Sequence, residues 1–377
     1  MRGMAPNDPI SAVTHPDPYP YYAALRERGP LVFDPSLKLW VAAQARSVMA
    51  VLGQGSCRVR PVAEPVPRAI EGTAAGSVFG RLVRMSDGDE QAAHKQAIGQ
   101  GLSGVDLAGL QAFASQQVPD QLATWAVDVP VHCIAHLLGW PDASRAQLSR
   151  WMRDFVACLS PLSSAQQLAM ASDAARSLID RMQALVQACV AAPGSLVQRI
   201  QQGRWHSADA LVANLIGLLS QTHDATAGLI GNCIVALLQR PDVLEQLRAE
   251  PARVTAFVRE VSRFDPSVQN TRRFVAEPTT LCGVELQPGD AILVLLAAAS
   301  RDGALHPDAD RFDMRREPAE LIGFGAGRHA CPGQSIAQAI AAGAMTQLLR
   351  GPMLSNADAI RWTYRPSVNA RIPVFSD

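Results

Sequence analysis

The segment of the chain that most constrains its fold is a glycine-rich stretch with one cysteine, Phe324–Gly333 (Phe-Gly-Ala-Gly-Arg-His-Ala-Cys-Pro-Gly). A predicted helix follows it, and Pro332 suits the first helical position because its missing N–H is not needed there. A thiolate at Cys331 would therefore face the positive end of a helix dipole. The glycines allow the backbone to approach a large flat ligand closely. This segment predicts an activated or metal-bound cysteine.

The overall charge and the apolar runs exclude several classes of protein. Lys+Arg and Asp+Glu both number 34, so no global electrostatic attraction draws the chain to nucleic acid. No apolar run is long enough to cross a bilayer, and the N-terminus lacks the apolar core of a signal peptide. We therefore expect a cytoplasmic protein with no membrane association. Its seven cysteines form no Cys-x-x-Cys pair and are odd in number, which argues against a zinc cluster or a disulfide framework.

Hydrophobic periodicity predicts a mainly α fold with minor β structure. Helical spacing dominates residues 88–250, including a long central helix over Leu211–Arg240, and another helix follows Cys331 to about residue 349. Residues 53–80, rich in Gly, Pro and Ala, predict a long loop. Short strands are predicted at Leu31–Phe33, Leu39–Ala42, Thr271–Val275, Thr279–Leu281 and Ala291–Leu296. We expect one domain over residues 1–377, a single large helical domain with small β-sheets.

A second pattern lies at the end of a predicted helical region, Leu244–Phe264. Glu260 and Arg263 are three residues apart and therefore share one helix face. Taken alone, such a pair is a surface ion pair that contributes about 0.2–1 kcal/mol.

Taken together, these features resemble the cytochrome P450 family over roughly residues 15–377. The cysteine segment matches the family's Phe-Gly-x-Gly-x-His-x-Cys-x-Gly loop, and Glu-x-x-Arg precedes it at the family's spacing. The resemblance implies the cytochrome P450 fold and a haem b cofactor (iron protoporphyrin IX). It makes Cys331 the proximal iron ligand, in a loop that begins with Phe324 and Gly325. Such a ligand donates electron density that favours O–O cleavage.

The resemblance also implies groups for the haem propionates and a structural ion pair. His329 and Arg273 match cationic positions of the family. In the helix near residue 90, Lys95 stands where the family has Arg and Gln91 where it often has His, whereas His94 would serve if the register were shifted. Glu260 and Arg263 would be buried with an arginine of the later charged segment, either Arg311 or Arg315. Removing one member of such a buried pair costs about 3–5 kcal/mol.

The central helix departs from the family pattern on the side where oxygen would bind. Its string Gln221-Thr222-His223-Asp224-Ala225-Thr226 puts Asp224 at the family's acid and Ala225 at the usual alcohol. Thr222 and Thr226 lie on other faces of an ideal helix. In the family, the acid and the alcohol together deliver protons during oxygen activation.

Three interpretations of this departure remain open. A hydroxyl of the substrate and ordered water complete the relay; or peroxide is the oxidant; or the chemistry is atypical, such as a dehydration or a rearrangement at iron. A haem-binding protein without turnover is a second class of function, and a helical protein without haem is a third.

The resemblance places the substrate beside the central helix and says little else of it. Gln221, Thr222, Gln269 and Asn270 would add polar groups to an apolar pocket. They favour a small or medium organic molecule with polar handles, oxidised with O2 in secondary metabolism. The chain is too short to hold a fused reductase or ferredoxin domain, so separate ferredoxin and ferredoxin reductase would supply electrons to a monomer. The stretch Ala191–Ser207 looks trimmed and predicts a smaller lid.

Overall fold

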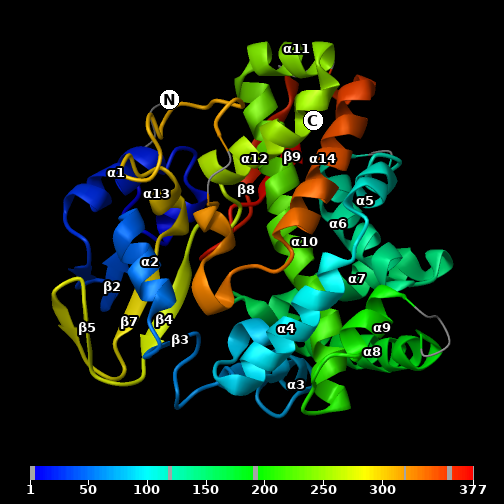
Figure 1. The fold of residues 1–377 in the computed structure, drawn as a ribbon, viewed down its shortest axis with the longest axis horizontal. Coiled ribbons are helices and arrows are strands. Elements are labelled where there is room, and N and C mark those ends of the chain that lie inside the picture. Colours follow the sequence, from blue (N-terminus) through cyan, green and yellow to red (C-terminus); the bar gives the residue numbers. More distant parts are fainter. Residues whose placement is uncertain (1–4, 118–120, 190–193, 318–319, 355–358, 377) are drawn as a thin grey trace.

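A computed structural model describes residues 5–117, 121–189, 194–317, 320–354 and 359–376. Helices make up most of it, and a small sheet lies to one side (Figure 1). The expected mainly α fold with minor β structure is confirmed. The helices are α1 Tyr19–Glu27, α2 Ala45–Gly53, α3 Ala74–Arg81, α4 Asp89–Ser103, α5 Leu107–Ala114, α6 Leu122–Leu138, α7 Arg145–Phe155, α8 Ala165–Cys189, α9 Leu196–Gln201, α10 Ala208–Gln239, α11 Pro241–Ala249, α12 Val254–Phe264, α13 Leu296–Ser300 and α14 Gln334–Arg350.

The strands form one mixed sheet and two hairpins. In the sheet the order is β1-β2-β7-β4-β3, with β2 and β7 parallel and the other neighbours antiparallel. The pairs β5–β6 and β8–β9 are antiparallel. The strands are β1 Val32–Asp34, β2 Leu39–Ala42, β3 Cys57–Arg58, β4 Thr271–Val275, β5 Thr279–Leu281, β6 Val284–Leu286, β7 Ala291–Val294, β8 Arg361–Tyr364 and β9 Pro373–Ser376.

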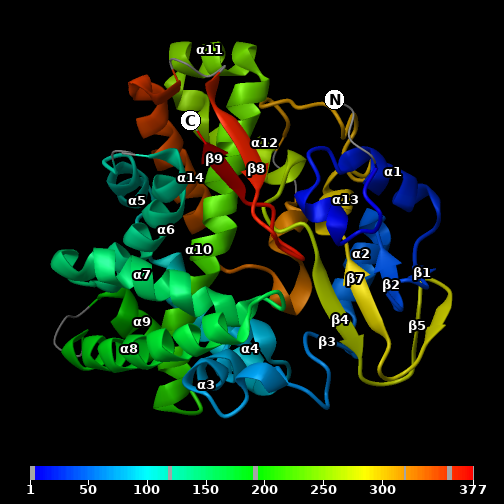
Figure 2. The ribbon, with the colours of Figure 1, turned by 180° about the vertical axis from the view of Figure 1, so that it is seen from behind.

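Helix α10 runs through the centre of the helical region and is buried along most of its length (Figure 1). Its first turn is capped by Ser207, whose hydroxyl accepts a hydrogen bond from the Ala210 N–H at 3.1 Å. Two glycines bring the C-terminal segment close to it. A Cβ on Gly228 would lie 2.9 Å from the Arg371 carbonyl oxygen, and one on Gly231 would lie 2.7 Å from Pro373 Cδ. The hairpin β8–β9 can therefore lie beside α10 (Figure 2).

Most predicted elements agree with the structure. The segment 53–80 does not, and the strand predicted over Ala291–Leu296 ends at Val294, with α13 beginning at Leu296. The central helix spans Ala208–Gln239, and the region predicted as one or two helices divides into α11 and α12. The prediction of a continuous loop over 53–80 was wrong, because it contains β3 and α3. Thr73 caps α3 by accepting the Gly76 N–H at 3.1 Å, and the helix packs on α8 and α10. Tertiary packing and this cap outweigh its two glycines.

Two other expectations concern membranes and the trimmed segment. Among the described residues, no helix is both long and apolar enough to span a bilayer. Residues 190–193 lie outside the described residues, and between there and α10 the structure has only the six-residue helix α9.

Candidate active site

The cysteine loop is a series of tight turns ahead of α14. The Cys331 N–H donates to the Phe324 carbonyl at 2.9 Å, and the Gly325 N–H donates to the Ile322 carbonyl at 2.8 Å. Gly325 and Gly327 have φ of 74° and 63°, a conformation that side chains disfavour. The helix begins at Gln334 with Gly333 as its N-cap, so the prediction that Pro332 occupies the first helical position was wrong.

The Cys331 thiol lies deep in the protein but is not covered by it. Burial raises the pKa of this thiol, while the Gly333 N–H and the Lys95 charge lower it. Yet Cys331 is one of the exposed cysteines of the described chain. Cys331 is therefore surrounded by protein atoms yet keeps exposed surface, as a cysteine that binds a ligand requires.

Helix α4 holds the loop from the N-terminal half of the chain. Lys95 Nζ and Gln91 Nε2 both donate to the Arg328 carbonyl, the latter at 3.2 Å. These two residues therefore share the face of α4 that is turned toward the cysteine loop. This is the register in which Lys95 takes the family's arginine position.

His94 lies on another face of α4. Its ring stacks on Trp205 and His206, with centroid separations of 4.7 and 5.0 Å, and it is buried. Desolvation lowers the pKa of His94. The interpretation of His94 as a propionate ligand is contradicted by this packing, which joins α4 to the segment before α10.

Arg273 and His329 lie on the sheet side of the loop. The Arg273 side chain is buried and Nη1 donates to the Arg272 carbonyl at 2.8 Å and to Thr271 Oγ1 at 3.3 Å. It has no ion pair with any described carboxylate. His329 Nε2 lies 3.0 Å from Asp87 Oδ1. Burial lowers the pKa of His329, so the neutral ring donates its Nε2–H to Asp87.

On α10, Asp224 is held in place by two partners. His223 Nδ1 and Arg365 Nη2 each lie 2.8 Å from its Oδ1. Burial alone would raise the pKa of Asp224, but the hydrogen bond and charge of His223 and the ion pair with Arg365 outweigh it and lower the pKa to about 2. Asp224 is therefore a carboxylate at neutral pH.

The neighbours of Asp224 on α10 make mostly local contacts. The Ala225 carbonyl accepts a hydrogen bond from Ser267 Oγ at 2.7 Å. Thr222 Oγ1 and Gln221 Nε2 donate to the Leu218 and Gly217 carbonyls, at 2.7 and 3.0 Å. Thr226 is buried on a different face of the helix.

Two residues predicted for the substrate pocket have structural roles instead. Gln269 is fully buried, donates to the Pro266 carbonyl at 2.7 Å and accepts from Tyr22 Oη at 3.2 Å. Asn270 Nδ2 donates to the Val368 carbonyl at 2.9 Å. Their polar groups are used within the fold, so the prediction that they offer polar groups to a substrate is corrected.

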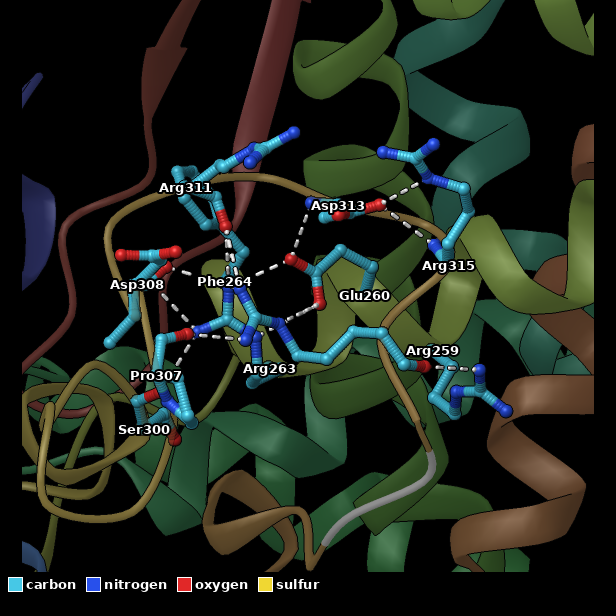
Figure 3. Close-up of polar contacts among 12 residues, drawn as sticks. Arg259, Glu260, Arg263, Phe264, Ser300, Pro307, Asp308, Arg311, Asp313 and Arg315 are labelled. Carbon is cyan, nitrogen blue, oxygen red and sulfur yellow. Dashed lines mark hydrogen bonds and ion pairs between the residues drawn. The ribbon is translucent and has the colours of Figure 1, made fainter.

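Glu260 and Arg263 form a buried bidentate ion pair, with N–O distances of 2.9 and 2.7 Å (Figure 3). Arg263 also donates to the carbonyls of Ser300, Ala309 and Arg311. The Asp313 N–H donates to Glu260 Oε1 at 2.9 Å. The pair thus fastens α12 to the charged segment that follows α13.

The third member of this cluster is Arg316, and neither Arg311 nor Arg315 takes that position. Arg316 Nε lies 3.7 Å from Glu260 Oε2. Arg311 contributes only its carbonyl, and the exposed Arg315 pairs with Asp313 (Figure 3). Arg316 directly follows Arg315 in the sequence, and no feature of the sequence distinguishes it as the partner of Glu260.

Comparisons with known proteins agree with this architecture. The cytochrome P450 family model matches residues 170–351. The chain is 31% identical to cytochrome P450 107B1 of Saccharopolyspora erythraea, over 68% of this chain and 64% of that protein. It is 32% identical to the mycinamicin IV hydroxylase/epoxidase of Micromonospora griseorubida, over 67% and 65%. The aligned part thus spans slightly under two thirds of these curated relatives.

Solved structures share the fold over nearly the whole chain. CalO2 aligns with a TM-score of 0.83 at 23% identity, covering 99% of this chain and 98% of that one. P450BioI, solved in complex with an acyl carrier protein, aligns with a TM-score of 0.81 at 23% identity, over 95% and 96%. The helical fold with its small sheets is the fold of these structures. This chain belongs to the cytochrome P450 family.

The family implies a haem cofactor, and the residues around Cys331 suit one. The accessible sulfur can ligate iron as a thiolate. Lys95 and Arg273 bring positive charge to the same loop, and Arg273 feels the charge of Asp87 but has no carboxylate oxygen within 4.0 Å among the described residues. A buried guanidinium of this kind matches a carboxylate-bearing ligand.

Several residues of the site were missed by sequence reasoning. Arg365 and Asp87 pair with predicted site residues, and Arg84 lies on the segment between α3 and α4, close enough to attract Asp224. No local motif marks any of them, because each acts on a partner more than a hundred residues away. His223 adjoins Asp224 in the sequence, and its spacing could have suggested the hydrogen bond.

Proposed function

We propose that this chain is a haem-thiolate monooxygenase that uses O2 to oxidise a small or medium organic molecule. The observation that carries the proposal is Cys331, an exposed cysteine in a loop whose shape is set by glycines and by contacts with α4. When bound, haem b supplies oxygen activation: one oxygen atom enters the substrate, and the other leaves as water after two electrons and two protons are delivered.

The residues around the loop have distinct proposed roles. Cys331 would bind the iron, and its thiolate character would tune the metal. Lys95 and Arg273 would pair with the two propionates. His329 would act indirectly, because its Nε2–H is committed to Asp87 and keeps that carboxylate in place.

Asp224 is the proposed relay for protons. Its side chain is 32% exposed, so it can take a proton from water and release it inward. The neighbouring residue is Ala225 and supplies no hydroxyl, so we propose that a substrate hydroxyl and ordered water complete the path. His223 keeps a second titratable group in hydrogen-bond contact with Asp224.

Ala225 is also the observation that supports a second candidate function. Without the alcohol, the same haem protein could use peroxide or carry out a dehydration or rearrangement at iron. A haem-binding protein without turnover is the remaining alternative. These candidates share the cysteine ligand and differ in the oxidant that they need.

We further propose a tailoring role in secondary metabolism, with electrons from a separate ferredoxin and ferredoxin reductase. The similarity to a mycinamicin hydroxylase/epoxidase supports the first part. The second part is what the resemblance to the family implies.

The first test is the absorption spectrum of the purified protein, reduced under carbon monoxide. We expect a red-shifted, thiolate-type Soret band in the wild type and in Cys282→Ala, a control at an exposed cysteine in the turn between β5 and β6. The band should vanish in Cys331→Ala. A histidine-type band or no band in the wild type would overturn the proposal.

The oxidant is then tested with labelled oxygen. Product that carries 18O from 18O2, formed only with ferredoxin, reductase and NADPH, supports the monooxygenase. Turnover with peroxide alone supports the second candidate. Haem binding without either turnover supports the non-catalytic alternative.

A further inference from the structure

Arg84 lies in a short helical turn, Val83–Met85, that is fastened to the central helix. Asn214 of α10 accepts the Val83 N–H at 2.8 Å and donates to the Arg81 carbonyl at 2.8 Å. Asn214 is itself buried and donates also to Ala210. The backbone that carries Arg84 is therefore fixed beside α10 before any ligand arrives.

The Arg84 guanidinium lacks a partner within the part of the chain that the structure describes. It makes no hydrogen bond, and no carboxylate oxygen lies within 4.0 Å of it. Its Nε is shielded from solvent. Desolvation lowers the pKa of Arg84, although arginine stays charged. Buried Arg263, in contrast, is saturated by Glu260 and three carbonyls. Arg84 is half-buried as a whole, and a cation that is partly shielded from water and has no partner is stabilised when a ligand supplies one.

The charges around Arg84 leave one positive charge in excess. The Cys158 thiol and the Asp224 carboxylate attract it. Burial raises the pKa of Cys158 to about 12, so that thiol is uncharged at neutral pH, and Asp224 already pairs with Arg365 at 2.8 Å. One carboxylate thus faces two guanidinium groups. The propionate-side residues Asp87, Arg273 and His329 interact with one another and not with Arg84. The unbalanced positive charge therefore lies near Asp224 of α10 and not among the residues proposed to bind the propionates.

We propose that the substrate of this enzyme carries a carboxylate and that Arg84 binds it. The inference rests on the proposed function and specifies its substrate class. A monocarboxylate balances the single excess charge, and its two oxygens match the fork of a guanidinium. Asp224 already forms an ion pair with Arg365, so it would not compete with the ligand for Arg84. The rest of the substrate would lie along α10.

The test compares carboxylic acids with their amides on the haem-loaded protein. The probes are two pairs of equal shape, 4-phenylbutanoate with 4-phenylbutanamide and decanoate with decanamide. Dissociation constants come from the change in haem absorption and from calorimetry. In the wild type we expect at least one acid to bind ten or more times more tightly than its amide.

Variants distinguish a specific effect of Arg84 on acid binding from a general effect of positive charge on the protein. Arg84→Gln should abolish the preference for the acid, and Arg84→Lys should keep part of it. Arg68→Gln removes an equal charge from a side chain that is 88% exposed and lies ahead of α3, and it should keep the full preference.

Three results would overturn the inference. One is a wild type that binds both acids no more tightly than their amides; another is an unchanged preference in Arg84→Gln. The third is loss of haem from Arg84→Gln but not from Arg68→Gln, which would assign Arg84 to the cofactor. A thiolate-type carbon monoxide spectrum in the same samples shows that the proposed function stands even if the inference fails.

Discussion

Arg365, which follows strand β8, pairs with Asp224 of α10 at 2.8 Å, joining the C-terminal hairpin to the centre of the candidate active site. Both side chains are partly exposed, so the pair is expected to contribute about 1 kcal/mol. A double-mutant cycle with Arg365→Gln and Asp224→Asn should give a coupling free energy of that size in urea unfolding. Strictly additive effects would show that the two groups do not interact in solution.

The same carboxylate should give stability a particular dependence on acid. The pKa of Asp224 in the folded protein is about 2, below the value of about 3.9 expected for an unfolded chain. Its contribution is therefore complete above pH 4 and is lost as pH falls from 4 toward 2. We expect the difference in unfolding free energy between wild type and Asp224→Asn to be constant from pH 7 to 5 and to shrink at pH 3. A difference that grows at pH 3 would contradict the sign.

The buried Glu260–Arg263 pair should be far more sensitive to substitution than its exposed neighbour. Glu260→Gln leaves Arg263 buried without its charge partner, which costs about 3–5 kcal/mol. Arg315→Gln removes one member of the exposed pair with Asp313 and should cost less than about 1 kcal/mol. Urea unfolding of the holoprotein measures both. Similar costs for the two variants would mean that Glu260 is not anchored as described.

Replacement of Ala225 by threonine tests whether the missing hydroxyl limits the reaction. We expect Ala225→Thr to raise the share of electrons that reach product and to lower peroxide release several-fold. Ala225→Val has nearly the same shape without the hydroxyl and should not. Peroxide formed per NADPH, with a surrogate ferredoxin and reductase, is the measurement. Equal values for Thr and Val would place the proton path elsewhere.

The two neighbouring residues of α4 should differ in their effect on haem. Lys95→Gln removes a positive charge near the cysteine loop and should speed haem loss to apomyoglobin about tenfold, whereas Lys95→Arg should retain haem at least as well. His94→Gln changes a side chain that packs on Trp205 and should leave the rate near that of the wild type. If His94→Gln releases haem faster than Lys95→Gln, the register of α4 described above is incorrect.

The sequence was most informative where a function depends on residues close together in the chain. The cysteine loop and Glu260–Arg263 are local patterns, and the turn and helix that carry them follow from the same residues. Arg365, Arg84 and Arg316 could not be found in this way, since each matters through a partner brought near by the fold. Gln269 and Asn270 were misplaced for a related reason: a polar residue near a pocket can equally satisfy a buried carbonyl.

Two hydrogen bonds from α4 to the cysteine loop end on the backbone carbonyl of Arg328, and a third ends on the carbonyl of Gly327. Any residue at position 328 offers that carbonyl, so the shape of the loop does not depend on which side chain stands there. Arg328 as a whole is partly exposed. A substitution at this position can thus change the local charge while the hydrogen bonds from α4 to the loop backbone remain. The electrostatics around the loop and the position of Cys331 can therefore vary independently.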